Sequence, residues 1–331
     1  MTQDKKIAVI GDGSWATALI KLLSNHSNNV LWYIREKSIS ESIKNFQRNP
    51  LYLSSVKIDL AKISLTNEIK DVDDFADIII FVVPSVYFLG TVEKLNFELL
   101  KDKIIISAIK GIIPENKMII SDYFASRNLN QDKYFNISGP CHAEEVALER
   151  LSYLTISGKN QVLSGDIAGL LSCRYINTTI GNDVKGIEYT ATMKNIYSIA
   201  AGVCKSQGFG DNFQAILLSN AIREMKKFLD IIDLNDRNIL SSVYIGDLAV
   251  TMYSQFSRNR NLGLMLGSGY SVKSAQLEMN MIAEGYYGTK SIKSIATEKG
   301  IDLPIVNAVY NILYEGISPF IEISLLTEKL N

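Results

Sequence analysis

The first half of the chain alternates short, mostly apolar runs with stretches of helical periodicity. The runs are of strand length and rich in β-branched residues, and they occupy residues 7–10, 29–34, 77–83, 104–108, 135–138 and 153–157. Apolar runs without polar alternation are typical of strands that are buried on both faces of a parallel sheet. Their alternation with helices predicts one α/β domain over residues 1–185, built on a doubly wound parallel sheet.

From residue 186 onward the apolar positions recur every three or four residues, and strand-like runs become rare. This spacing predicts a C-terminal all-helical domain over residues 186–331. Within residues 186–203 one helical face collects Ile187, Ala191, Lys194, Ser198 and Ala201. A second amphipathic helix is predicted over residues 213–232, with a buried side formed by Phe213, Ile216, Leu217, Met225, Phe228 and Leu229. Residues 281–285, MIAEG, are typical of a helix end with a glycine stop.

The segment IGDGSWA joins the first predicted strand to the first predicted helix. Gly11 permits the turn out of the strand, and Gly13 removes the side chain where a pyrophosphate would approach the backbone. Ala16 stands at the third position of this fingerprint, which tolerates alanine. The N–H groups of the following helix would face the phosphates, at the positive end of the helix dipole. The strand, turn and helix in this order favour a dinucleotide site of the Rossmann type over an ordinary turn.

Arg35 ends the second predicted strand, roughly 20 residues beyond the glycine turn, where this fold places the residue that reads the adenosine ribose. An acidic residue there binds the ribose hydroxyl of NAD, whereas an arginine accommodates the 2′-phosphate of NADP. Arg35 therefore slightly favours NADPH, and a solvated arginine at the strand end is the alternative. The neighbouring Glu36 leaves NADH open.

Proton transfer in this chain falls to lysines and carboxylates, because there are only two histidines. Lys110 follows a predicted buried strand, where a ligand contact and a solvated side chain are both open. Lys194 lies in a stripe of small residues that leaves room for a ligand or the other domain, which favours a functional role over a lysine that snorkels to water. The segment SRNR, residues 257–260, supplies forked donors suited to a phosphate, although a charged helix end has the same composition.

Composition narrows the class of protein. The chain has 331 residues, 47% hydrophobic and 21% charged, with a net charge of −1. This charge gives no overall field that would attract nucleic acid or an acidic membrane surface. Three cysteines without metal-ligand spacing predict free thiols in a reducing compartment and no metal site. No secretion signal precedes residue 7 and no apolar run approaches ~20 residues, so we expect a cytoplasmic protein without membrane insertion.

Eight short motifs occur in order over nearly the whole chain: IGDGSWATAL, VPS, IKG, SGPCHAEEV, MKN, GDL, SRNR and AEGYY. This set resembles the soluble NAD(P)-dependent glycerol-3-phosphate dehydrogenases of bacteria. The resemblance implies reversible hydride transfer between NAD(P)H and dihydroxyacetone phosphate, which gives sn-glycerol 3-phosphate for membrane phospholipid synthesis. It also implies a homodimer.

The resemblance assigns roles to individual residues. Lys194 matches the lysine that exchanges the proton, and Lys110 and Asp247 complete the catalytic set. The implied cofactor contacts are Gly11, Gly13, Ser14, Trp15, Arg35, Lys110, Ala143, Arg258, Ile282 and Glu284. The implied substrate contacts are Lys110, Gly139, Cys141, Lys194, Asp247, Ser257, Arg258 and Asn259.

The chain departs from the family pattern at Ala16, at Cys141, where serine or threonine is more usual, and in the approaches to Lys194 and Asp247. These changes bear on cofactor preference and effector control rather than on reaction class. Two alternatives share the glycine turn: a dehydrogenase of a hydroxy acid or of ketopantoate, and a dinucleotide sensor without turnover. A phosphate clamp at SRNR disfavours the first, and the three catalytic groups together disfavour the second.

Overall fold

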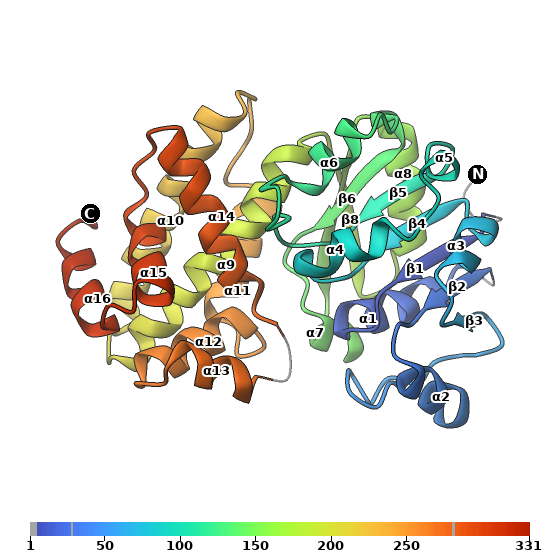
Figure 1. The fold of residues 1–331 in the computed structure, drawn as a ribbon, viewed down its shortest axis with the longest axis horizontal. Coiled ribbons are helices and arrows are strands. Elements are labelled where there is room, and N and C mark those ends of the chain that lie inside the picture. Colours follow the sequence, from blue (N-terminus) through green and yellow to red (C-terminus); the bar gives the residue numbers. More distant parts are fainter. Residues whose placement is uncertain (1–4, 28, 280–281) are drawn as a thin grey trace. The chain divides into compact units, whose positions relative to one another are not determined.

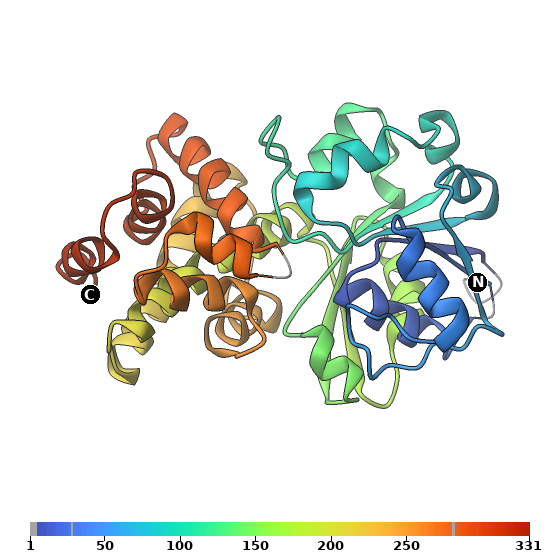
Figure 2. The same ribbon diagram turned by 60° about the horizontal axis from the view of Figure 1, so that its bottom comes forward.

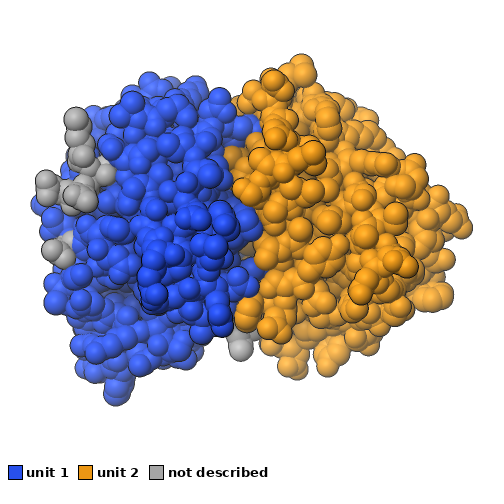
Figure 3. All heavy atoms as spheres, turned by 180° about the vertical axis from the view of Figure 1, so that it is seen from behind, with its two compact units in different colours: residues 1–109, 120–184 blue, residues 110–119, 185–331 orange. Residues whose placement is uncertain are grey.

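The computed structural model describes residues 5–27, 29–279 and 282–331. The chain forms two compact units, one of residues 1–109 and 120–184 and the other of residues 110–119 and 185–331 (Figure 3). Residues 110–119 were expected in the first domain, whereas in the structure they belong to the helical unit. Lys110 is therefore part of the second unit.

The first unit is built on an eight-stranded sheet in the order β3-β2-β1-β4-β5-β6-β7-β8 (Figures 1 and 2). The strands are β1 Ile7–Ile10, β2 Val30–Tyr33, β3 Ile63–Thr66, β4 Ile78–Phe81, β5 Ile104–Ser107, β6 Tyr134–Ser138, β7 Ser152–Gly158 and β8 Ile176–Gly181. The doubly wound Rossmann-type sheet is confirmed, with one exception to its parallel order. Strands β6 and β7 pair antiparallel, with Ile137 opposite Ile156.

Helices cover both faces of this sheet, as the continuous apolar strands require. They are α1 Ser14–Leu23, α2 Lys37–Phe46, α3 Lys70–Phe75, α4 Ser85–Val92, α5 Phe97–Leu100, α6 Ile120–Ser126, α7 Ala143–Ala147 and α8 Gln161–Leu171, with a 3₁₀ turn at Gln131–Lys133. One face buries an aliphatic core that includes Val9, Leu19 and Ile167. On the other, Phe81 packs edge-to-face on Phe88 of α4. Burial of large apolar side chains on both faces fixes the sheet between its helices.

The second unit is all-helical in its described residues and is built around one long helix, α9 Val184–Ser206 (Figure 1). The other helices are α10 Asp211–Ile232, α11 Asp247–Tyr253, α12 Arg258–Gly267, α13 Val272–Glu278, α14 Glu284–Glu298, α15 Pro304–Tyr314 and α16 Pro319–Thr327, with a π-helical turn at Ser242–Gly246. Every residue of α9 from Gly186 to Cys204 is buried. Two of its threonines are paired within the helix, because Thr190 donates to the carbonyl of Gly186 at 2.8 Å and Thr192 to that of Glu188 at 3.1 Å.

Two glycines serve the packing of α9 against α12. A Cβ on Gly202 would overlap the carbonyl of Arg260, and a Cβ on Gly263 would overlap the carbonyl of Ile199. Helices α9 and α12 therefore cross at backbone contact, and glycine is required on both sides of the crossing.

Two expectations for the helical unit were wrong. Ile216, predicted to face the core, is 43% exposed on α10. Residues 281–285 were expected to end a helix, but Glu284 begins α14 instead, and Met281 lies outside the described residues. Gly285 is small because its Cβ would lie 2.8 Å from the carbonyl oxygen of Asn195, where the first turn of α14 meets α9.

A buried carboxylate on α10 supports the start of α15. Glu224 is 6% exposed, and its Oε1 accepts a hydrogen bond from the backbone N–H of Ile305 at 2.6 Å. Burial raises the pKa of Glu224 to about 8, against the opposing effect of the backbone N–H donors.

Across the described part of the chain, none of the helices combines the length and the apolar character that crossing a membrane would need.

Candidate active site

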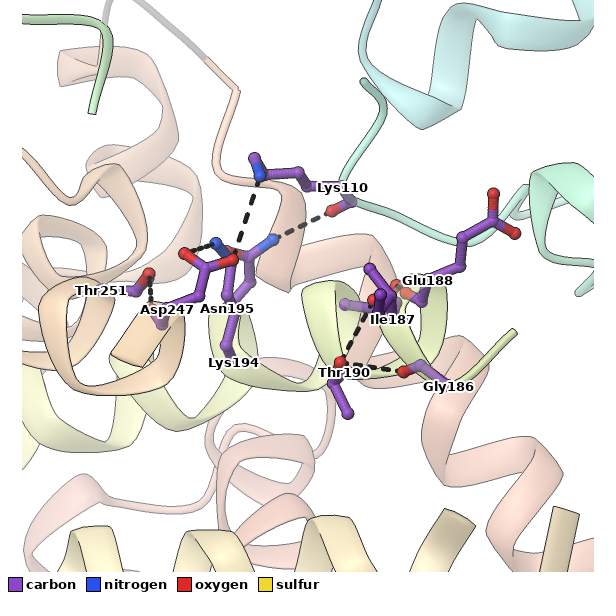
Figure 4. A network of polar contacts seen from close by, with 10 residues as sticks. Lys110, Gly186, Ile187, Glu188, Thr190, Lys194, Asn195, Asp247 and Thr251 are labelled. Carbon is purple, nitrogen blue, oxygen red and sulfur yellow. Dashed lines mark hydrogen bonds and ion pairs between the residues drawn. The ribbon is translucent and has the colours of Figure 1, made fainter. Parts of the chain in front are cut away.

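Two lysines and one carboxylate converge in the helical unit (Figure 4). Lys194 Nζ donates to Asp247 Oδ1 at 2.5 Å, and Lys110 Nζ lies 4.0 Å from Asp247 Oδ2. The side chains of Lys194 and Asp247 are only 5% and 4% exposed, whereas that of Lys110 is 26% exposed. Burial of a charged pair offers little net stability, so this arrangement is a candidate for chemistry rather than for folding.

The elements around the cluster fix each charged group separately. Lys194 projects from the middle of α9, and Asp247 is the first residue of α11, directly after the π-helical turn. Asn195 Nδ2 donates to the backbone carbonyl of Lys110 at 3.0 Å and so holds that lysine's backbone against α9. Asn195 was not among the predicted site residues. The signal for it was a second polar side chain directly beside Lys194.

The start of α12 carries the predicted phosphate segment. Ser257 is its N-cap and accepts from the backbone N–H of Arg260 at 3.3 Å. Arg258, the next residue, is half-buried and has no hydrogen-bond or ion-pair partner among the residues that the structure describes. Asn259 Oδ1 accepts from the backbone N–H of Gly285 at 2.8 Å, which leaves the donors of its amide as the groups it can offer a ligand.

In the first unit, glycine is needed at positions 11 and 13 for different structural reasons. Gly11 has φ +138°, and a Cβ there would lie 2.5 Å from the carbonyl oxygen of Val82, so only glycine fits. A Cβ on Gly13 would meet nothing within 4 Å. Gly13 caps α1 without a side-chain hydrogen bond, so N–H groups of the first turn are open to an anion at this place.

Two side chains outside the motif hold the glycine turn by its carbonyls. Trp32 Nε1 donates to the carbonyl of Gly11 at 2.6 Å, and Asn49 Nδ2 donates to the carbonyl of Asp12 at 2.9 Å. Asn49 is fully buried, and Trp32 is as well. Because a peptide's C=O and N–H point in opposite directions, these bonds direct the N–H groups of the turn away from the two side chains. Asn49 was not among the predicted site residues.

The residues around the turn fit a dinucleotide. Space is open beside Gly13, and the indole Nε1 of Trp15 is buried with no hydrogen-bond partner in the described structure. Burial raises the pKa of the Asp12 carboxyl, and the guanidinium of Arg35 opposes this shift. Ser14, also a predicted cofactor contact, is buried in the first turn of α1.

Arg35 lies just past β2 with its side chain 59% exposed. Its Nη2 is 3.0 Å from Glu36 Oε1, and its guanidinium lies over the ring of Tyr87, 5.4 Å from the centroid. The ion pair is exposed and therefore weak, so it leaves the guanidinium available to a second anion. This is the position expected for a contact with a 2′-phosphate.

The remaining predicted residues lie in loops or at the beginning of helices. Gly139 has φ +132°, and a Cβ there would lie 2.6 Å from the carbonyl oxygen of Tyr153, so backbone geometry alone requires glycine. Cys141 is half-buried and Ala143 begins α7. In the helical unit, Ile282 and Glu284 are half-buried before and at the start of α14. All three cysteines are free thiols, as expected.

Comparison with known proteins covers both units. A family model described as NAD-dependent glycerol-3-phosphate dehydrogenase N-terminus matches residues 6–164, and one described as the C-terminus of the same enzyme matches residues 183–323. Two proteins named glycerol-3-phosphate dehydrogenase [NAD(P)+] are each 32% identical to this chain. That of Staphylococcus haemolyticus matches 94% of this chain and 94% of its own length, and that of an Exiguobacterium species matches 98% and 95%.

Solved structures agree with these matches. The crystal structure of glycerol-3-phosphate dehydrogenase from Coxiella burnetii superposes with a TM-score of 0.90 at 25% identity, over 98% of this chain and 99% of that one. Sequence models, relatives and fold all point to one family over nearly the full length. This chain belongs to the NAD-dependent glycerol-3-phosphate dehydrogenase family.

Proposed function

We propose that this glycerol-3-phosphate dehydrogenase uses Lys194, Asp247 and Lys110 as its reacting groups in the reversible conversion of dihydroxyacetone phosphate to sn-glycerol 3-phosphate. The observation that carries the proposal is the buried contact of 2.5 Å between Lys194 Nζ and Asp247 Oδ1, with Lys110 on the other carboxylate oxygen. Family membership supports the substrate, and the geometry supports the roles.

Reduction of a ketone requires stabilisation of charge on its oxygen and a proton for the resulting alkoxide. The bound nicotinamide would supply hydride to the carbonyl carbon, or accept hydride in the reverse direction. Lys194 Nζ gives its proton to the substrate oxygen and takes it back in the reverse reaction. Asp247 accepts one of the three ammonium hydrogens and thereby orients the others. Lys110, the more exposed lysine, holds the substrate and adds positive charge beside the oxygen.

The phosphate of the substrate binds at the start of α12. Arg258 offers a guanidinium that the described residues leave without a partner, and the first turn of this helix offers backbone N–H groups at the positive end of its dipole. Asn259 adds the amide donors that remain after its oxygen has accepted from Gly285.

The glycine turn between β1 and α1 holds the pyrophosphate of NAD or NADP. We favour NADPH slightly, because Arg35 stands where a 2′-phosphate is read, while Glu36 keeps NADH a usable cofactor. The resemblance further supports a homodimer in the cytoplasm that supplies glycerophospholipid synthesis. Light scattering of the purified protein would measure the oligomeric state.

The test is loss of absorbance of NADPH or NADH on addition of dihydroxyacetone phosphate. The parent protein should turn over, and Lys194→Ala should lose about 10²–10⁴-fold in kcat while it binds cofactor as the parent does. Lys205→Ala is the matched control, because Lys205 is on the same helix but its ammonium lies at the surface, 3.6 Å from Asp211. If Lys194→Ala keeps turnover within a few-fold of the parent, the assigned proton transfer is wrong.

A further inference from the structure

One buried hydroxyl on α9 connects three helices of the proposed active site. Ser198 is 0% exposed. Its Oγ donates to the backbone carbonyl of Thr251 at 2.6 Å, near the end of α11, and lies 2.8 Å from the Oγ of Ser257, the N-cap of α12. No role follows for Ser198 from the family resemblance, which assigns Ser257 to the substrate.

Hydrogen counting fixes the direction of both bonds. A serine hydroxyl carries one proton, and the carbonyl of Thr251 can only accept. Ser198 therefore donates its one hydrogen to that carbonyl. The contact between the two serines must then be donated by Ser257. Ser257 Oγ also accepts from the backbone N–H of Arg260 at 3.3 Å. Its proton is therefore committed inside the protein, and the hydroxyl has no hydrogen left to donate to a substrate phosphate.

The location of Ser198 relates it to the reacting pair. Ser198 follows Lys194 by four residues on α9, and Thr251 follows Asp247 by four residues on α11. Residues four apart lie on the same face of a helix, so the Ser198–Thr251 bond repeats the Lys194–Asp247 contact one turn further along both helices. Thr251 Oγ1 also donates to the carbonyl of Asp247 at 2.6 Å, which closes the link within α11.

We propose that Ser198 is a positioning residue, which holds Asp247 of α11 and the first turn of α12 in register with Lys194. We propose also that Ser257 supports the substrate through this link rather than by donating its own hydroxyl to the phosphate. The proposal rests on the roles given above to Lys194, Asp247 and α12. Both serines belong to the helical unit, whereas the glycine turn belongs to the other unit, so their loss should leave cofactor binding at that turn unchanged.

The experiment is a double-mutant cycle of Ser198→Ala and Ser257→Ala, with kcat and KM for dihydroxyacetone phosphate and the Kd of NADPH by titration calorimetry. Ser198→Ala should lower kcat by about 10-fold or more, since it leaves the buried carbonyl of Thr251 without a donor and the proton of Ser257 without an acceptor. The Kd of NADPH should stay within about two-fold of the parent. Thr192→Val is the matched control, because Thr192 is a buried hydroxyl of α9 that donates only to the carbonyl of Glu188 in its own helix.

The cycle separates the two roles of Ser257. If the link carries its effect, Ser257→Ala costs activity in the parent and almost nothing in the Ser198→Ala background. An equal penalty in both backgrounds would show direct donation to the phosphate and overturn the proposal, as would normal kcat in Ser198→Ala. If Ser198→Ala does not fold, Ser198→Cys retains a weak donor of similar volume and serves in the same cycle. An inactive parent would refute the proposed function itself, whereas the outcomes above presuppose an active one.

Discussion

Two glycines of one turn should fail in opposite ways when each is replaced by alanine. At Gly11 the added Cβ meets the carbonyl oxygen of Val82 at 2.5 Å and its carbon at 2.9 Å, and φ is +138°. At Gly13 the added Cβ meets nothing within 4 Å, and φ is −79°. Gly11→Ala should therefore destabilise the fold, whereas Gly13→Ala should obstruct the binding of the pyrophosphate.

The magnitudes follow from the surroundings. Strand β1 is paired with β4 along its whole length, so the backbone of Gly11 cannot move away from Val82. Backbone strain at such a φ costs about 1–3 kcal/mol, and the overlap adds to it, so unfolding free energy should fall by about 3 kcal/mol or more. Gly13→Ala changes an N-cap and should cost only about 0.5–1 kcal/mol. A methyl group in the path of the phosphate should weaken NADPH about 10- to 100-fold, or roughly 1.4–2.7 kcal/mol.

Urea unfolding followed by circular dichroism measures the first quantity, and titration calorimetry with NADPH measures the second. Gly90→Ala is the control for the substitution itself, because it lies within α4 and its added Cβ also meets nothing within 4 Å. Gly13→Ala that binds NADPH as tightly as the parent would refute the placement of the pyrophosphate. Gly11→Ala as stable as the parent would refute the argument from the Val82 carbonyl.

Three other substitutions test single groups. Arg35→Ala should raise KM for NADPH about 10-fold and leave KM for NADH unchanged. An equal effect on both would show that Arg35 does not bind the 2′-phosphate. Arg258→Ala should lower kcat/KM for dihydroxyacetone phosphate about 100-fold but leave that for dihydroxyacetone unchanged, and an unaltered preference would contradict a phosphate contact. The folded pKa of Glu224, about 8, lies above its unfolded value, so its contribution to stability is complete below about pH 4.5 and is lost as pH rises toward 8. Relative to Glu224→Gln, the parent should therefore lose more than about 1 kcal/mol between pH 5 and 8.5 in urea unfolding, and parallel curves would show that the carboxyl ionises normally.

Periodicity predicted those parts of the fold that are buried symmetrically. Strands β1, β4 and β5 are apolar on both faces, and their runs were visible in the sequence. Strand β8, INTTIG, has mostly exposed or half-buried side chains and left no such run. The reversal of β7 was hidden because hydrophobicity shows that a strand is buried but not which way it runs. Helix α9 is buried on all sides, so periodicity alone could not distinguish the face that carries Lys194 from the others.

The site residues also divide into those that the sequence revealed and those that it did not. Motifs identified Lys110, Lys194 and Asp247 through a family resemblance, because residues so far apart in the chain give no periodic signal. The residues that were missed act on backbone carbonyls, as Asn195 does on Lys110 and Trp32 does on Gly11. A carbonyl carries no side-chain identity, so its hydrogen-bond partner becomes apparent only in three dimensions.

The hydrogen bond from Trp32 to the carbonyl of Gly11 gives the enzyme an intrinsic fluorescent label. The chain contains two tryptophans, and both flank the dinucleotide turn: Trp15 from the first turn of α1 and Trp32 through its bond to the Gly11 carbonyl. Intrinsic tryptophan emission therefore originates entirely beside this turn. Quenching of tryptophan emission by reduced nicotinamide, or a spectral change as the indole hydrogen bond breaks, would report events in the nucleotide-binding unit without any dye, because the helical unit contains no tryptophan.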